Sequence, residues 1–258
     1  MARDMRRRNL SLAALGAVVV AACIATILHG PVPQDPAYHA FADQRTLLGV
    51  PSFWNVASNL PFLWVGVLGL REVLGGCRGG LPSLRWAYGA YFVGVAGVSL
   101  GSGYYHAAPS TETLVWDRLP MAFSFMTFVG IVWAEHVDER MGRRIIVPLI
   151  ALGVFSVWYW YYTETLGRGD MRVYALLQFL TVAVLAMLLL LFPSRLHGVG
   201  YLWMMFAGYA LAKVLEHFDA AIYEALGRQM SGHTLKHLAA AAGLYGLVLA
   251  LRHRTARP

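Results

Sequence analysis

Long apolar stretches follow one another along nearly the whole chain, separated by short segments that hold most of its charged, proline and glycine residues. Each stretch holds about 20 residues, the length that an α-helix needs to cross a bilayer. Short alternating segments, as in a membrane β-barrel, are absent from the pattern. We therefore expect eight spanning helices, at residues 10–29, 52–74, 84–106, 114–134, 144–162, 172–192, 199–218 and 232–251.

Composition supports a membrane protein. Of the 258 residues, 58% are hydrophobic and only 14% are charged, whereas an ordinary soluble domain carries about 25% charged residues. The formal net charge of +7 would suggest nucleic-acid binding in a soluble protein, but here the basic residues lie in short loops, where membrane topology explains them. We expect an all-α, polytopic helix bundle without a nucleic-acid partner.

The basic residues also predict the orientation of the chain. Segments on the side of the N-terminus hold 14 of the 21 Lys and Arg residues, the opposite segments hold 4, and the other 3 lie inside spans. An excess of Lys and Arg marks the cytoplasmic side, and an even number of spans places both termini there. We interpret residues 1–30 as a basic segment with an uncleaved anchor helix, and residues 52–251 as a core of seven helices.

Polar side chains gather near the outer ends of several predicted spans. Ser102 and His106 end the third span, Asp117 begins the fourth, and His233 and His237 begin the eighth. Ionisable groups within a membrane are costly, and they usually face a bundle interior or a functional cavity. Their position at one depth indicates a functional site on the outer side.

The residue types and their spacing favour a metal site. His233 and His237 are four residues apart, which places both imidazoles on one helix face, about one turn apart along the axis. Together with His106 they would leave the fourth position of a zinc ion open, as in catalytic zinc sites. Asp117 could then handle the proton of a water molecule, and the Ser102 hydroxyl could hydrogen-bond an oxyanion. This set favours hydrolysis of an amide or ester.

Simpler explanations exist for each residue taken alone. A histidine pair can hydrogen-bond across helices, a serine can bond its own helix backbone, and Asp117 can pair with Arg118. Their common depth favours the metal site. His217 is the main rival ligand.

Further polar residues lie at the same depth, and we consider them as residues around the metal or the substrate. Asn55, Ser58 and Asn59 could lie around the metal or substrate, but they could equally well form hydrogen bonds between helices. Lys213 and Glu216, three residues apart, could pair with each other. Glycines 97, 101 and 103 suggest close approach of helices. The candidate residues around the metal or substrate are Asn55, Ser58, Asn59, Tyr105 and Glu216.

Three motifs occur in an order that resembles the alkaline ceramidase family of the CREST superfamily of membrane hydrolases. They are Phe53-Trp54-Asn55-Val56-Ala57-Ser58-Asn59, Gly101-Ser102-Gly103-Tyr104-Tyr105-His106 with Asp117 eleven residues later, and the pair His233 and His237. The resemblance implies a seven-helix core that binds zinc through His106, His233 and His237. It also implies that Asp117 handles the water, that Ser102 lies near the scissile carbonyl, and that the amide of ceramides is cleaved to a sphingoid base and a fatty acid.

The chain departs from this family at one position. Ceramidases of this family in eukaryotes have an acidic calcium site that includes a Glu directly before the Phe-Trp-Asn motif, where this chain has Ser52. Asp35 and Asp43 are the only acids in the preceding loop, so the case for a calcium site is weakened. The many Ala, Gly and Arg residues are typical of bacteria, which predicts an inner-membrane protein with its site facing the periplasm. Another lipid amide or ester is an alternative substrate.

Two other classes of function remain open. One is a lipid-binding, receptor-type protein in which zinc holds helices together. The other is a transporter or haem-type redox protein that uses histidine pairs, although the chain lacks the repeats and broken helices that many transporters have. The oligomeric state is not indicated by the sequence.

Overall fold

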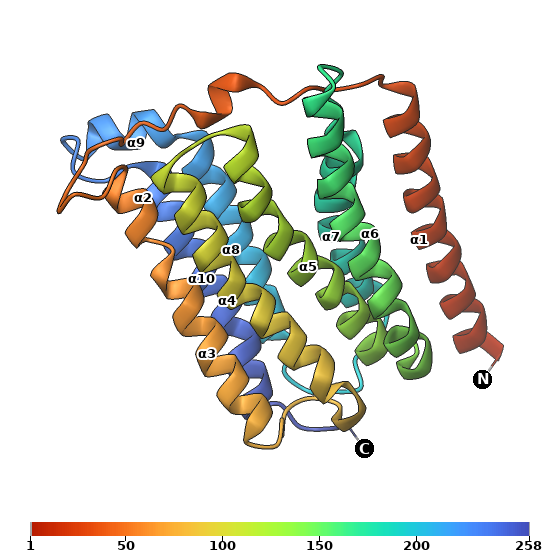
Figure 1. Cartoon of the computed structure of the whole chain (residues 1–258). Helices are drawn as coiled ribbons and strands as arrows, with labels where there is room; N and C mark the ends of the chain where they lie inside the picture. Colours follow the sequence, from red (N-terminus) through yellow and green to blue (C-terminus); the bar gives the residue numbers. More distant parts are fainter. Residues whose placement is uncertain (1, 258) are drawn as a thin grey trace. The chain divides into compact units, whose positions relative to one another are not determined.

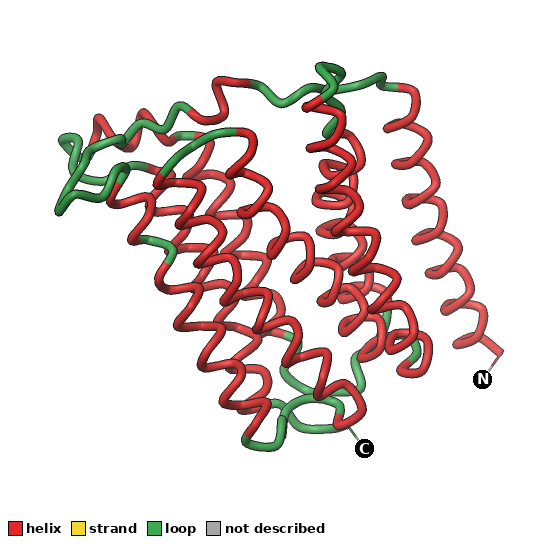
Figure 2. The backbone as a smooth tube through the Cα atoms, in the orientation of Figure 1, coloured by secondary structure: helices red, strands yellow, loops and turns green. Residues whose placement is uncertain are grey.

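The computed structural model describes residues 2–257 and is built from helices joined by loops (Figure 1, Figure 2). This confirms the all-α fold. The α-helices are α1 (Ala2–Leu28), α2 (Phe53–Ala57), α3 (Leu60–Leu74), α4 (Arg85–Ala107), α5 (Thr111–His136), α6 (Glu139–Thr165), α7 (Arg172–Leu191), α8 (Gly200–His217), α9 (Asp219–Ala225) and α10 (Gly232–His253). Two short 3₁₀ helices, η1 (Pro36–His39) and η2 (Pro82–Leu84), lie in loops.

Six helical segments of the described chain are long and apolar enough to cross a membrane: α1, α2 with α3, α5, α6, α7 and α10. They support an integral membrane protein. Helices α4 and α8 occupy two further predicted spans but are not among the six. Both carry polar side chains at their C-terminal ends, including Ser102 and His106 in α4 and Lys213 and Glu216 in α8.

The second predicted span is interrupted, which corrects the expectation of one helix over residues 52–74. Helix α2 ends at Ala57 and α3 begins at Leu60. Pro61 has no backbone N–H to continue the hydrogen-bond ladder. In addition, the side chains of Ser58 and Asn59 both donate to the carbonyl of Asn55, and such local bonds compete with a regular helix.

The chain divides into two compact units. One comprises Met1–Gln34 and Phe125–Arg195, and the other comprises Asp35–Ser124 and Leu196–Pro258. We call them the anchor unit and the site unit. Helix α5 contributes its second half to the anchor unit and its first half to the site unit.

In the anchor unit, α7 packs against α1 and α6. The loop before α7 is fixed by Arg172, whose Nε and Nη2 donate to the two carboxylate oxygens of Asp170 over 2.8 Å each. The same guanidinium donates to the carbonyls of Thr26 and Ile27 at the end of α1. The side-chain bonds from Arg172, together with its backbone N–H, its charge and a bond from Tyr159, outweigh burial and lower the pKa of Asp170 to about 2. A single ion pair therefore caps α1 and ties it to α7.

In the site unit, α10 packs along α8 and α3, and α3 packs along α4 (Figure 1). Small residues allow the closest contacts, as in many membrane helices. A Cβ on Gly208 of α8 would lie 2.5 Å from the Cα of Gly243 of α10, and a Cβ on Gly101 of α4 would collide with the carbonyl oxygen of Trp116. The expectation of close approach is thus met at Gly101.

Gly97 and Gly103, which were also expected at close helix contacts, have different surroundings. A Cβ on Gly97 would lie 3.2 Å from the Cβ of Pro120, a tight contact that agrees with it. Around Gly103 a Cβ would meet no atom within 4 Å, so the expectation is wrong there. Gly103 faces away from the neighbour that its helix approaches at Gly101.

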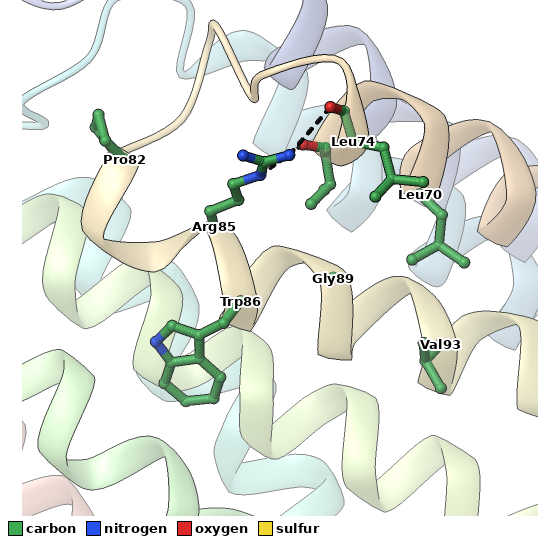
Figure 3. A pocket seen from close by; sticks show the side chains of 8 residues that line it. Leu70, Leu74, Pro82, Arg85, Trp86, Gly89 and Val93 are labelled. Carbon is green, nitrogen blue, oxygen red and sulfur yellow. Dashed lines mark hydrogen bonds between the residues drawn. The ribbon is translucent and has the colours of Figure 1, made fainter.

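An apolar groove of about 610 Å³ lies between the end of α3 and the start of α4 (Figure 3). Arg85 borders it and donates to the carbonyls of Val73 and Leu74, which caps α3. The groove is at the opposite end of α4 from His106. The 21 residues between Arg85 and His106 span about 30 Å of helix, so the groove is separate from the candidate site.

Candidate metal centre

Three histidines from two helices converge in the site unit. His106 comes from the end of α4, and His233 and His237 come from the start of α10. The Nε2 atoms of His106 and His233 lie 3.3 Å apart, and each of the three rings offers one nitrogen within 4.8 Å of the other two. All three are at most 6% exposed. The structure therefore brings together the three predicted ligands.

The start of α10 fixes the orientation of its two histidines. Ser231 is the N-cap, and its side chain accepts from the backbone N–H of Thr234 over 3.1 Å, the usual role of serine at this position. Asp219 accepts from the backbone N–H of His233 over 2.7 Å and, with its other oxygen, from that of Ala42 over 3.0 Å. Asp219, to which the sequence assigned no role, thus joins three separate segments beneath the histidines.

Ser58 determines which nitrogen of His237 faces the cluster. Its hydroxyl lies 2.8 Å from Nδ1 of His237 and donates its own proton to the carbonyl of Asn55 over 3.2 Å. A hydroxyl that donates to this carbonyl accepts from the Nδ1 proton of His237. The lone pair of His237 is then on Nε2. Ligand histidines in metal sites are commonly oriented by such a partner.

Asn55 and Asn59 support this arrangement from behind. Asn55 is fully buried, accepts from the Thr234 hydroxyl over 2.9 Å and donates to the carbonyl of Asp43 over 3.0 Å. Asn59 donates to the carbonyl of Asn55 over 2.7 Å. Asn55 and Asn59 therefore form the structural hydrogen bonds that were one of the two interpretations of this motif. Of the three residues, Ser58 is the one that hydrogen-bonds a histidine of the group.

The residues present fit a zinc ion. Zinc–nitrogen bonds of 2.0–2.1 Å at a tetrahedral angle separate two nitrogens by about 3.3 Å, the distance between the Nε2 atoms of His106 and His233. Nδ1 of His106 is buried and has no hydrogen-bond partner among the described residues. No protein group at Nδ1 therefore prevents this ring from binding a metal through Nε2. Three imidazole donors without a thiolate resemble the donor set of catalytic rather than structural zinc sites.

Ser102 and Asp117 lie together beside the histidines. Ser102 is buried, one turn before His106 on α4, and its hydroxyl hydrogen-bonds the half-buried Asp117 carboxylate on α5. The close contact at Gly101 allows this, because it brings α5 against α4 next to Ser102. Arg118 places its guanidinium over the ring of Tyr38, 5.7 Å from the centroid.

The loop after α1 contributes a residue that the sequence did not reveal. The ring of Phe41 packs against His106 and His233, with centroids 4.6 and 4.4 Å away, and is 6% exposed. A loop has no periodicity that would mark such a residue. Next to it, His39 bonds the Tyr105 hydroxyl over 2.9 Å, and partial burial together with the charge of Arg118 lowers the pKa of His39.

The acids of the same loop have protein partners. Both oxygens of Asp43 accept from Arg45, over 2.9 and 2.7 Å, and Arg45 also donates to the carbonyl of Gln229. Burial alone would raise the pKa of Asp43, but the bonds and charge of Arg45 outweigh it and the pKa is lowered. Asp35 accepts from the backbone N–H of Ala37 as the N-cap of η1.

Glu216 pairs with two lysines, one more than the sequence indicated. Lys213 donates to one carboxylate oxygen and Lys236 to the other. Lys236 lies between the two α10 histidines, and its spacing of three from His233 is the signal that could have indicated its place. His217 is exposed and lies outside the histidine group.

Fold and site together define a class, an all-α membrane protein with a buried group of three histidines that could hold a metal ion. The family model for ceramidases matches residues 49–256, which is most of the chain, and the protein belongs to the ceramidase family. Membership implies a hydrolase that acts on an amide and takes a lipid as substrate. A comparison with curated proteins gives no match.

Proposed function

We propose that this protein is a zinc-dependent integral-membrane hydrolase that cleaves the amide bond of ceramide-like lipids. The observation that carries the proposal is the convergence of three buried imidazoles next to a hydrogen-bonded Ser102–Asp117 pair. A group that only held helices together would have no need of a carboxylate and a hydroxyl beside it.

His106, His233 and His237 would hold the zinc ion, with the lone pair of His237 directed by Ser58. When bound, zinc supplies a Lewis acid that polarises a carbonyl and makes water a better nucleophile. The hydroxyl of Ser58 would accept from the Nδ1 proton of His237 in this arrangement, which leaves Nε2 for the metal.

Asp117 would act as the general base and then as the general acid. It takes one proton from water as the oxygen adds to the amide carbon, and it returns that proton to the nitrogen as the carbon–nitrogen bond breaks. The products are a fatty acid and an amine. Ser102 orients the carboxylate by donating to it, and its hydroxyl can turn to donate to the oxygen of the former carbonyl as negative charge develops there.

Phe41 and Tyr105 would keep bulk water from the histidines, since both are almost fully buried against them. The acyl chain of the substrate would lie between helices and its head at the outer side of the membrane, with both termini in the cytoplasm. The excess of basic residues on the N-terminal side supports this orientation, and composition supports a bacterial inner membrane.

The test is hydrolysis of a ceramide by purified, zinc-loaded protein in detergent. We expect equal amounts of free fatty acid and sphingoid base, loss of both after chelation, and recovery when zinc is restored. Lipid that binds but never yields product would instead indicate a receptor-type protein with structural zinc, and product formation that survives complete zinc removal would contradict the proposal.

A further inference from the structure

Asp219, the first residue of α9, bonds two segments that meet at the histidines. One of its carboxylate oxygens accepts from the backbone N–H of His233 over 2.7 Å, and the other accepts from that of Ala42 over 3.0 Å. Ala42 directly follows Phe41, whose ring packs against His233. We call residues 39–43 the Phe41 loop. A single side chain is thus bonded both to the helix that carries a candidate ligand and to the loop that covers this ligand.

The bond to His233 fixes the start of α10. The first N–H groups of a helix have no partner within the helix. Ser231 accepts that of Thr234, and Asp219 accepts that of His233 from another helix. Gly232 allows this close approach, because a Cβ there would lie 2.8 Å from the Cα of Asp219. A movement of the carboxylate is therefore passed directly to the backbone that carries the imidazole.

The bond to Ala42 fixes the Phe41 loop. The ring of Phe41 is 6% exposed and covers the imidazoles of His106 and His233, with centroids 4.6 and 4.4 Å away. The backbone directly after this ring is held by Asp219. The position of the loop therefore depends on the same carboxylate that holds the start of α10.

A parallel link runs through Asn55. Its side chain donates to the carbonyl of Asp43 in the Phe41 loop and accepts from the hydroxyl of Thr234 in α10. Two side chains from different helices thus join the same loop to the same helix start. Of the two, Asp219 bonds the amide of a candidate ligand itself and the residue next to Phe41, so its link is the more direct.

We propose that Asp219 is a positioning residue that couples metal binding by the histidines to closure of the Phe41 loop. When His233 is held by a metal, its amide holds the carboxylate in place, and the carboxylate holds Ala42 and the ring of Phe41 over the centre. This rests on the zinc site of the proposed function. Coupling of this kind is reciprocal, so closure of the loop raises the metal affinity by the same factor by which the metal favours closure.

Hydrogen exchange of the loop amides, measured by mass spectrometry in detergent with and without zinc, tests the coupling. In the wild type we expect zinc to slow exchange in residues 39–45 at least about tenfold, within the usual range of coupling between sites. Asp219→Asn leaves one acceptor oxygen for two donors, so the slowing should fall below about threefold and the zinc affinity by about tenfold. Ala42→Pro, which removes the donor on the loop side, should reduce the slowing likewise.

Glu224→Gln is the matched control. Glu224 is also an acid of α9, but it is 61% exposed and paired with Arg228, so zinc should slow exchange in this variant as in the wild type. A merely structural role of Asp219 would lower the stability of Asp219→Asn and leave the ratio of exchange with and without zinc unchanged. That unchanged ratio would overturn the proposal, as would equal exchange of the wild-type loop with and without zinc.

Exchange and metal content separate this inference from the proposed function. If zinc slows exchange in the wild type but not in Asp219→Asn, and no lipid is hydrolysed, the amidase function fails and the coupling stands. If zinc-loaded protein hydrolyses lipid but its loop exchanges equally with and without zinc, the coupling fails and the function stands. Protein that takes up no zinc would overturn both.

Discussion

Both units fix a loop with the same device, an aspartate two residues before an arginine. Asp43 and Arg45 in the site unit, and Asp170 and Arg172 in the anchor unit, each form two side-chain bonds of 2.7–2.9 Å. Each arginine then reaches a distant carbonyl, Arg45 that of Gln229 and Arg172 those of Thr26 and Ile27. In both pairs the charges are neighbours in sequence and satisfy each other.

The site unit differs in what lies beside its Asp-x-Arg pair. His106, Asp117 and His237 come from α4, α5 and α10, and the histidines face one another without a carboxylate between them. In these two units the Asp-x-Arg pairs fix loops, whereas His106, Asp117 and His237 are brought to one place from distant helices and lie next to one another unpaired by a neighbour in sequence, as expected for groups that take part in chemistry.

The same substitution should have opposite consequences in the two units. Asp117→Asn removes the proposed base, so we expect turnover to fall by about 10²- to 10⁴-fold with zinc content and thermal stability retained. Asp170→Asn removes a partner of Arg172, so we expect near-normal turnover but lower stability, by about 1–3 kcal/mol. Turnover assays, metal analysis and thermal denaturation in detergent measure the three quantities.

The pH dependence of stability provides a check on the second variant. The pKa of Asp170 is lowered from 3.8 to about 2. Its stabilising contribution is therefore complete above about pH 4 and is lost as the pH falls toward 2. Wild type and Asp170→Asn should converge in stability over that interval; a constant difference down to pH 2 would contradict the role of this ion pair. Normal turnover in Asp117→Asn would contradict the role of Asp117 as the general base.

Gly101 and Gly103 of α4 allow a substitution at a close helix contact to be compared with the same substitution in open space. Gly101→Ala forces α5 away from α4 at Trp116, and overpacking of this kind costs about 1–3 kcal/mol. Since it also displaces Asp117 from Ser102, we expect turnover to fall by roughly 100-fold. Gly103→Ala meets no neighbour and should leave turnover and stability almost unchanged. Similar losses in both variants would mean that helix α4 does not hold Ser102 against α5.

Two buried serines provide a finer test. Ser58→Ala removes the acceptor at Nδ1 of His237, and loss of such a partner lowers metal affinity by about 10- to 100-fold. Ser156 of the anchor unit is buried too, but it bonds only its own helix, at the carbonyl of Gly153. Ser156→Ala should retain wild-type affinity in a zinc titration; unchanged affinity in Ser58→Ala would remove Ser58 from the metal centre.

The smallest effect is expected from calcium. Both oxygens of Asp43 are bonded to Arg45, and the residue directly before the Phe-Trp-Asn motif is Ser52, which has no carboxylate to offer a calcium ion. Millimolar calcium added to protein prepared without it should therefore change turnover less than about twofold, because moving Arg45 aside would sacrifice two charged hydrogen bonds. Strong activation would show that calcium displaces the guanidinium.

Much of the fold follows from the sequence because long apolar runs predict helices directly. The span expected at residues 232–251 is observed as Gly232–His253. The break before α3 could have been predicted from Pro61, but a continuous apolar pattern concealed it. The grouping of His106, His233 and His237 could be predicted from the four-residue spacing of the last two and from the common depth of all three in the predicted spans.

Other parts of the site depend on contacts that no local pattern encodes. Phe41 lies in an irregular loop and reaches the histidines only through the path of the folded chain. Whether Ser58 bonds a helix or a ligand depends on one side-chain rotation, so both interpretations of its motif remained open. Lys236 could be placed on the histidine face by spacing, but its partner Glu216 is 20 residues away on another helix.

Metal analysis of detergent-purified protein would show whether the three imidazoles of the site unit hold one zinc ion. We expect about one zinc per chain in the wild type and in His217→Ala, whose side chain is exposed and outside the group, and loss of zinc in His237→Ala. No zinc in the wild type after reconstitution, or zinc retained in His237→Ala, would contradict the account.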